Sequence, residues 1–324
     1  MRPFSYAAPA TVEQAVSLLE AEGSEVLAGG TDLLSLLKDD VEQVERLVAL
    51  RGIEDLSGID ASGGRLRIGS MTTLQELRDH ADAMAAEPAL GTAIDGVASA
   101  QLRAMGTVGG DLLQRPRCWY YRRGFGLLAQ GENGRSMVTE GDNRYHAIFP
   151  EGDARFVSPS SLAPLLIALE AEATVHGPDG ERRVPVEALY RTPRAEGERE
   201  NTLGPGELLV EVTASVGAAR SAVYEVRQRR SLDWPLMAAA VSLYGEGPLV
   251  DRARIVLGHA APTPRLAAAA GDLLAGRELT PERIVEAAEA AVEGARPMSG
   301  NRYKIQLATV AVRRALLRAA GMEA

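Results

Sequence analysis

The chain has 324 residues, and 46% of them are hydrophobic, which is enough to build the core of two compact domains or of one elaborated domain. Its 35 basic and 44 acidic residues give a net charge of −9 without a dense Lys/Arg block, so a nucleic-acid partner is not expected. No apolar run approaches the roughly 20 residues of a membrane span, and the first residues lack the apolar stretch of a signal peptide. We expect a cytoplasmic protein without a membrane span.

The first fifty or so residues alternate helical and strand patterns. Thr11 and Gln14 predict a capping box in front of a helix, and residues 25–28 predict a short buried strand that Gly29 and Gly30 stop. Leucines after this turn predict a second helix, and a further strand is expected at residues 46–50. We expect an α/β subdomain at residues 1–57.

A second subdomain is expected at residues 58–216, and it opens with a hairpin around Ser62-Gly63-Gly64 and a helix capped by Thr72 or Thr73. The charged residues 191–201 predict a solvated loop. Further elements are expected in this order: a helix near residues 89–97, a helix at 162–169, a hairpin around 177–180 and a strand at 208–212. Within this unit, residues 115–156 show little periodicity and predict a functional loop or a mobile insertion.

The last part of the chain predicts a separate α+β domain at residues 217–324. Strands are expected at residues 238–243 and 254–257, followed by alanine-rich helices with caps at Thr280 and near Ser299. The fold class is therefore α+β.

The chain has a single cysteine, Cys118, which excludes an internal disulfide. One thiolate cannot build an all-cysteine zinc site or an iron–sulfur cluster, so such a centre must lie on another chain. The histidines show no paired ligand spacing, and we expect surface or packing roles for all four of them: His80, His146, His176 and His259.

Two glycine-rich loops carry the functional signal, Ala28-Gly29-Gly30-Thr31-Asp32 and Thr107-Val108-Gly109-Gly110-Asp111. Paired glycines after a buried strand let the backbone approach a ligand, and successive amides there can point at an anion such as a pyrophosphate. Neither loop matches the G-x-G-x-x-G fingerprint or the phosphate loop of kinases. The spacing suggests that separate subdomains hold one dinucleotide. Asp111 could accept a hydrogen bond from a ribose or a flavin, or it could cap a helix that starts at Leu112.

These loops, with Ala98-Ser99-Ala100-Gln101-Leu102-Arg103 before the second one, resemble the FAD-binding subunit of the molybdenum hydroxylases. That family includes the medium subunits of carbon monoxide dehydrogenase, xanthine dehydrogenase, aldehyde oxidoreductase and 4-hydroxybenzoyl-CoA reductase. The resemblance extends to Leu257-Gly258 and to Tyr303-Lys304. It implies a fold like that of vanillyl-alcohol oxidase, with two α/β subdomains around FAD and a third covering domain.

The resemblance also implies partners and site residues. A large molybdopterin subunit and a small [2Fe–2S] subunit would deliver electrons to FAD, and the acceptor would be NAD, oxygen, a quinone or a carrier protein. The flavin does the redox chemistry, so no catalytic side chain is expected. The residues implied to contact the cofactor are Leu27, Ala28, Gly29, Gly30, Thr31, Asp32, Leu33, Thr107, Gly109, Gly110, Asp111, Gln114, Ser161 and Arg227.

Three positions depart from the family pattern. The Arg117-Cys118-Trp119-Tyr120 motif resembles a branch whose insertion carries a [4Fe–4S] cluster on four cysteines, but no later cysteine exists here. Residues 118–156 are then a cluster-free remnant of the insertion or a mobile surface loop. Ser161 stands where relatives commonly have an aspartate, and Arg227 stands near their usual lysine. Arg227, Arg229 and Arg230 form a small basic cluster that could meet NAD, a partner or solvent.

Three functions follow from these observations. The leading one is a non-covalent FAD subunit of a heterotrimeric molybdenum-dependent dehydrogenase. A flavin-free scaffold of the same complex is the second, because of the changes at Ser161 and near Arg227. A stand-alone FAD oxidase is the third. Some relatives with the Cys118 motif work in the periplasm after export with a partner, so that compartment stays open.

Overall fold

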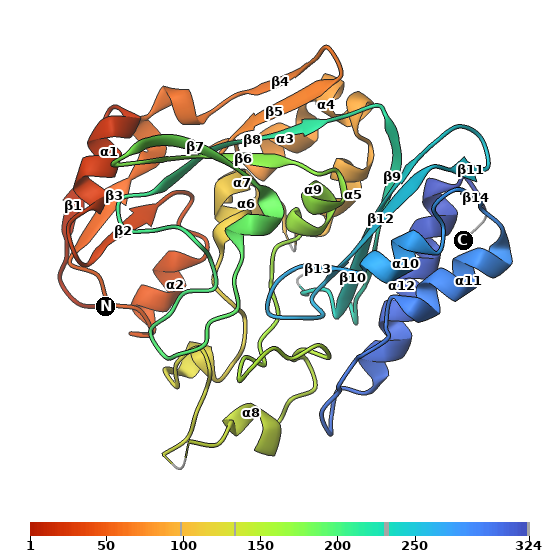
Figure 1. The fold of residues 1–324 in the computed structure, drawn as a ribbon. Helices are drawn as coiled ribbons and strands as arrows, with labels where there is room; N and C mark the ends of the chain where they lie inside the picture. The colour runs from red at the N-terminus through yellow and green to blue at the C-terminus, as the bar shows by residue number, and fades with distance from the viewer. Residues whose placement is uncertain (98, 133, 230–232, 323–324) are drawn as a thin grey trace.

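The computed structural model describes residues 1–97, 99–132, 134–229 and 233–322. Ala98 of the family motif and Arg230 of the basic cluster lie outside the described residues. Three main sheets follow one another along the chain, in its N-terminal, middle and C-terminal parts (Figure 1). The mixture of helices and sheets confirms the predicted α+β class. Among the described residues, none of the helices combines the length and apolar character that a membrane span requires.

The N-terminal sheet has three parallel strands in the order β1-β3-β2. Thr11 caps the first helix by accepting a hydrogen bond from the Gln14 amide, but the Gln14 side chain binds the Ala10 amide instead of Thr11, so only half of the predicted capping box forms. The elements are β1 (Ser5–Ala7), α1 (Val12–Leu19), β2 (Ser24–Leu27), α2 (Leu33–Lys38), β3 (Arg46–Ala49) and the 3-10 helices η1 (Leu50–Gly52) and η2 (Glu54–Leu56).

The middle part holds a five-stranded antiparallel sheet in the order β4-β5-β8-β6-β7, and the helices before the insertion lie beside it (Figure 1). Both predicted hairpins form, and Thr73 makes a complete capping box with Glu76. The elements are β4 (Ile59–Ser62), β5 (Arg65–Gly69), α3 (Leu74–Asp79), α4 (Ala81–Ala86), α5 (Ala89–Asp95), α6 (Ala100–Met105), α7 (Val108–Leu113), α9 (Ala163–Ala168), β6 (Glu172–Gly177), β7 (Gly180–Pro185), η4 (Val186–Leu189) and β8 (Leu208–Ser215).

Residues 115–156 run as an irregular segment below the sheets in Figure 1, and the regular elements among its described residues are η3 (Tyr121–Arg123) and α8 (Met137–Glu140). The segment encloses an apolar cluster of its own, in which Cys118, Leu128 and Phe156 are buried together with Leu36 of α2. The Cys118 Sγ atom lies 3.1 Å from His146 Nε2. This packing gives the segment a small core of its own. Its origin as a remnant of the insertion stays a prediction.

The C-terminal sheet has the order β13-β12-β10-β9, and α10, α11 and α12 cover one of its faces (Figure 1). The strands predicted at residues 238–243 and 254–257 form. The strand β9, which carries polar residues and lies at the edge of the sheet, was not predicted from the sequence. Thr280 caps α11 as predicted, whereas the cap expected near Ser299 is wrong, because α12 begins at Tyr303. The elements are β9 (Ala219–Val226), β10 (Met237–Tyr244), β11 (Leu249–Val250), β12 (Arg252–Gly258), β13 (Arg265–Leu266), α10 (Ala268–Asp272), β14 (Arg277–Glu278), α11 (Pro281–Ala290) and α12 (Tyr303–Ala319).

Candidate functional site

A cavity of about 460 Å³ lies where the N-terminal and middle parts of the chain meet. This volume is within the range of small-molecule pockets, about 300–1,000 Å³. Four of the predicted contact residues do not line the cavity: Leu27, Asp111, Ser161 and Arg227. The others do: Ala28, Gly29, Gly30, Thr31, Asp32, Leu33, Thr107, Gly109, Gly110 and Gln114. The structure therefore brings both glycine loops to one cavity, although nearly 80 residues separate them.

The first glycine loop, residues 28–32, presents unused donors. Within the described part of the chain, the amides of Gly29, Gly30, Thr31 and Asp32 donate no hydrogen bond. Gly30 adopts φ of 71°, a conformation that favours glycine, and its carbonyl accepts from the Leu34 amide at 3.3 Å. Consecutive unpaired amides form a concave nest that suits anionic oxygens.

Gly29 presses the first loop against the chain that leads into the second one. A Cβ atom built at Gly29 would stand 1.8 Å from the carbonyl oxygen of Met105, a backbone atom that no rotamer change can move. Only glycine fits here, since any side chain would push the two loops apart.

The second glycine loop, residues 107–111, is the first turn of α7. Thr107 caps this helix by accepting from the Gly110 amide at 3.1 Å. The amides of Val108 and Gly109 donate to the carbonyls of Thr72 and Ser70 at 2.9 and 2.8 Å. The alternative role of Asp111 as the cap of a helix starting at Leu112 is wrong, because α7 already begins at Val108. This loop has no free amide at Val108, Gly109 or Gly110 for a phosphate.

The Asp111 carboxylate is buried and turned towards the protein. Its oxygens accept from Ser160 Oγ at 2.5 Å, from the Leu162 amide at 3.0 Å and from Gln114 Nε2 at 3.0 Å. Burial raises the pKa of this carboxyl above its ordinary value, against the effect of these hydrogen bonds. The neighbouring Ser161 hydroxyl is also buried, and it has no hydrogen-bond partner among the described residues.

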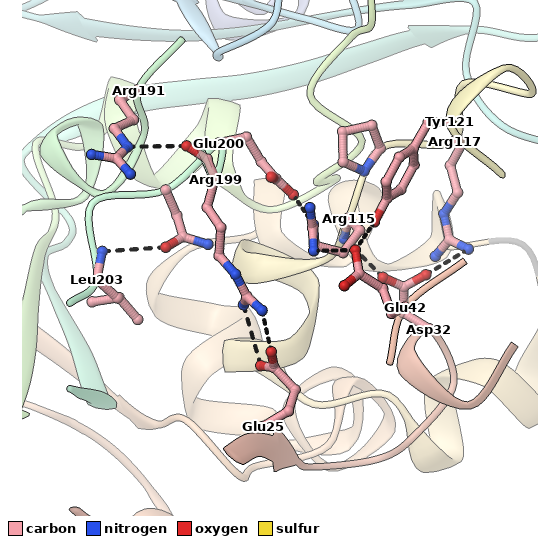
Figure 2. Close-up of polar contacts among 12 residues, drawn as sticks. Glu25, Asp32, Glu42, Arg115, Arg117, Tyr121, Arg191, Arg199, Glu200 and Leu203 are labelled. Atoms are coloured by element: carbon pink, nitrogen blue, oxygen red, sulfur yellow. Dashed lines mark hydrogen bonds and ion pairs between the residues drawn. The ribbon is translucent and has the colours of Figure 1, made fainter. Parts of the chain in front are cut away.

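The Asp32 carboxylate at the end of the first loop is held by the irregular segment (Figure 2). It accepts from the Arg115 amide at 2.8 Å and from the Arg122 guanidinium at 2.6 Å, and Arg117 lies 3.0 Å away. Burial lowers the pKa of Arg117 to about 10, against the attraction of Asp32. Residues 115–122 thus fix the first loop from outside.

Three further ion pairs lie beside the cavity, and Figure 2 shows their residues. Arg115 lies between Glu200, at 2.6 Å, and Glu42, at 2.7 Å. Arg199 pairs with Glu25 of β2. Residues 194–198 are exposed, but Glu200 and Asn201 are buried. The prediction of a solvated loop at residues 191–201 is therefore wrong at its C-terminal end.

Arg227 does not line the cavity that the two glycine loops share. Its guanidinium is bound to the Glu225 carboxylate and to the Gly96 carbonyl. Burial raises the pKa of Glu225 to about 7, in spite of the attraction of Arg227. The positive charge of Arg227 is therefore directed to protein groups. Within the described ranges, no group of three or more His, Cys, Asp or Glu side chains is arranged to hold a metal ion.

Sequence reasoning missed several residues that line the cavity, among them Ser70, Arg115, Arg199 and Asn201. The signal that could have found Arg199 was its positive charge in Arg199-Glu200, together with the acidic Glu25 that precedes the first loop by only a few residues. Their approach depends on pairing between distant segments.

Comparison with known proteins identifies this arrangement. The FAD-binding domain of molybdopterin dehydrogenases matches residues 2–214, and the C-terminal domain of the CO dehydrogenase flavoprotein matches residues 222–319. The medium chain of carbon monoxide dehydrogenase from Hydrogenophaga pseudoflava is 31% identical over 97% of this chain and 96% of its own length. The chain belongs to the family of FAD-binding medium subunits of molybdenum hydroxylases.

Other members of this family show the same extent of similarity. The aldehyde oxidoreductase FAD-binding subunit of Escherichia coli K12 is 29% identical, with 95% of both chains covered. The structure of reconstituted CO dehydrogenase from Oligotropha carboxidovorans matches with a TM-score of 0.79 at 27% identity, covering 99% of both chains. The predicted family, the FAD-binding fold and the class of FAD-dependent oxidoreductase subunit are confirmed.

The first loop fits the phosphate part of FAD by its own chemistry. Four successive amides without partners need an acceptor, and the pyrophosphate of FAD offers anionic oxygens. The Ser161 hydroxyl also has no partner among the described residues, but it does not line this cavity. When bound, FAD supplies redox chemistry, while the residues of this chain bind and orient it.

Proposed function

We propose that this chain binds FAD non-covalently and serves as the flavin subunit of a molybdenum-dependent dehydrogenase. A large molybdopterin subunit and a small [2Fe–2S] subunit would be its partners, and electrons from their centres would leave through FAD to NAD, oxygen, a quinone or a carrier protein. The observation that carries this proposal is the nest of four unpaired amides, Gly29 to Asp32, in a cavity that the second loop also lines.

The residues of the two loops have different proposed roles in binding FAD. Gly29 and Gly30 give the phosphates access to the backbone, and Thr31 adds an exposed hydroxyl donor. Thr107, Gly109 and Gly110 shape the opposite wall, where their value is close packing rather than hydrogen bonding. We also propose that the functional units are residues 1–57, 58–216 and 217–324, which the separation into three sheets supports. The cytoplasmic location stays a prediction.

Free amides support flavin binding over the flavin-free scaffold, because a scaffold has no use for four unsatisfied donors in a cavity. The family's dependence on partner subunits, as in the medium chains it matches, weighs against a stand-alone oxidase.

Purification tests both parts of the proposal. The protein, expressed with its neighbouring subunits, should show flavin absorbance that passes into the supernatant on acid denaturation, and two partner chains should co-purify. A colourless protein that FAD cannot reconstitute would contradict flavin binding. Turnover of an alcohol or aldehyde by this chain alone would favour the stand-alone oxidase.

A further inference from the structure

The walls of the loop cavity carry a surplus of negative charge. Of the described residues that line it, six are acidic and only Arg115 and Arg199 are basic. The pyrophosphate of FAD is a dianion, and carboxylates around it in a medium less polar than water repel it. Amides alone offer partial charges, so a bound pyrophosphate needs a cation that can turn towards it.

Arg115 is largely buried and is shared by two carboxylates. Its Nε atom lies 2.6 Å from Glu200 and its NH1 atom 2.7 Å from Glu42, and only 14% of its side chain is exposed. Burial acts to lower the pKa of Arg115, but Glu200, Tyr121 and Glu42 hold that pKa above its ordinary value. This guanidinium is committed to holding three chain segments together.

Arg199 differs from Arg115 in the number of its carboxylate partners and in its exposure. Glu25 is its one carboxylate partner among the described residues, and 41% of its side chain is exposed. The contacts to Glu25 use NH1 and NH2, so the Nε hydrogen and the outer hydrogens of the fork stay available. Arg199 lines the cavity, and Glu25 lies in the strand that runs directly into the first loop (Figure 2).

We propose that Arg199 is a pyrophosphate-binding residue of this chain and that Glu25 competes with the ligand for its charge. The inference rests on the proposed function, because it requires FAD in this cavity. In the free protein Glu25 holds the guanidinium over the cavity, and in the complex the phosphate oxygens take up the remaining N–H donors. The planar guanidinium of Arg199 suits this arrangement, since the Glu25 carboxylate and a phosphate can bind to different edges of it.

The test compares two substitutions that a purely structural ion pair would make equivalent. Arg199→Gln should weaken FAD binding to the apoprotein by about tenfold or more, because a hydrogen bond to a charged group is lost. Glu25→Gln should instead leave FAD binding unchanged or tighten it, because the competing carboxylate is gone. Equal weakening in both variants, or wild-type affinity in Arg199→Gln, would overturn the proposal. Flavin fluorescence quenching gives the dissociation constants.

Two ligands smaller than FAD test which part of the cofactor Arg199 contacts. ADP keeps the pyrophosphate, whereas adenosine lacks it. Calorimetric titration with ADP should show the same loss in Arg199→Gln as with FAD, while adenosine should bind both proteins equally. An equal loss for adenosine would show that Arg199 acts through the shape of its loop, which would contradict the proposal.

Arg182→Gln is the matched control. Arg182 pairs with Glu207 at 2.7 Å and is 39% exposed, but it does not line the cavity itself. This variant should keep the wild-type affinity for FAD and ADP. Arg199→Lys should recover part of the affinity, because the charge is restored without the fork. Thermal unfolding of each apoprotein identifies any variant that fails to fold.

The failures of the two proposals are distinguishable. If the wild-type apoprotein binds neither FAD nor ADP, the proposed function fails. If it binds both and the Arg199→Gln variant binds them equally well, only the role of Arg199 fails.

Discussion

The loop at residues 28–32 and the loop at residues 107–111 both carry paired glycines and end in aspartate, yet their amides serve different purposes. In the first loop, the amides of Gly29 to Asp32 are unpaired within the described chain, and the aspartate is held by arginines of the irregular segment. In the second loop, the four amides of Val108 to Asp111 are bonded to protein oxygens, and the Asp111 carboxylate is buried against Ser160.

The two loops show that paired glycines can serve two structural purposes around one cavity. In the first loop, glycine exposes donors to a ligand. In the second loop, it permits close packing: a Cβ at Gly109 would stand 3.0 Å from the Ser70 Cβ. The first loop is therefore the proposed phosphate site, and the second loop supplies a wall of fixed shape.

The largest effect is expected at Gly29. In Gly29→Ala, the added carbon would meet the Met105 carbonyl oxygen at 1.8 Å, and overpacking of this kind costs about 3 kcal/mol of unfolding free energy. FAD affinity should fall by about a hundredfold or more, since the loops must separate. Urea unfolding and FAD titration measure the two losses.

Gly110→Ala is the matched control from the second loop. Its nearest neighbour would be the Thr107 Oγ1 atom at 3.0 Å, and alanine is favoured over glycine inside a helix. The unfolding free energy should stay within about 1 kcal/mol of the wild type. Equal destabilisation by both variants would contradict the difference between the loops.

An intermediate effect is expected at Asp111. In Asp111→Asn, the new amide group faces the Gln114 side-chain donor, so about 1–2 kcal/mol of unfolding free energy should be lost at pH 7. Burial raises the pKa of Asp111 in the folded state, so the wild type gains stability as the pH falls through this raised pKa towards the unfolded value. The variant has no carboxyl group at this position and would show no such gain. The advantage of the wild type should therefore grow from pH 7 to pH 5 in urea titrations, and a constant difference would contradict the burial effect.

The smallest effects on stability are expected for the two threonines, Thr107 and Thr31, one in each loop. Thr107→Val removes the cap of α7 and should cost about 1 kcal/mol of unfolding free energy. Thr31→Val should leave stability unchanged within about 0.5 kcal/mol, because this exposed hydroxyl has no partner among the described residues, but it should weaken FAD binding by about fivefold. Thermal unfolding and FAD titration of both variants check this pairing, and a stability loss in Thr31→Val would show that the first loop also supports the fold.

Much of the fold could be predicted from local patterns. Thr73 with Glu76 forms the capping box, Gly177 to Gly180 form the turn of a hairpin, and Thr280 caps α11, because each signal acts over three or four residues. The edge strand β9 was missed, since its polar residues pair with only one neighbouring strand and show little apolar alternation.

The sequence by itself predicted the family and the α+β class, and it gave the two glycine loops as the proposed cofactor site, because the combination of these two local motifs is specific. Only the tertiary structure decided which loop keeps its amides free. That outcome depends on the Ser70 and Thr72 carbonyls, which accept from amides of the second loop, whereas no carbonyl of the described residues accepts from the amides of Gly29 to Asp32. It also decided that Arg199 faces the cavity while Arg115 is shared by Glu42 and Glu200, because these pairs join segments that are up to 174 residues apart.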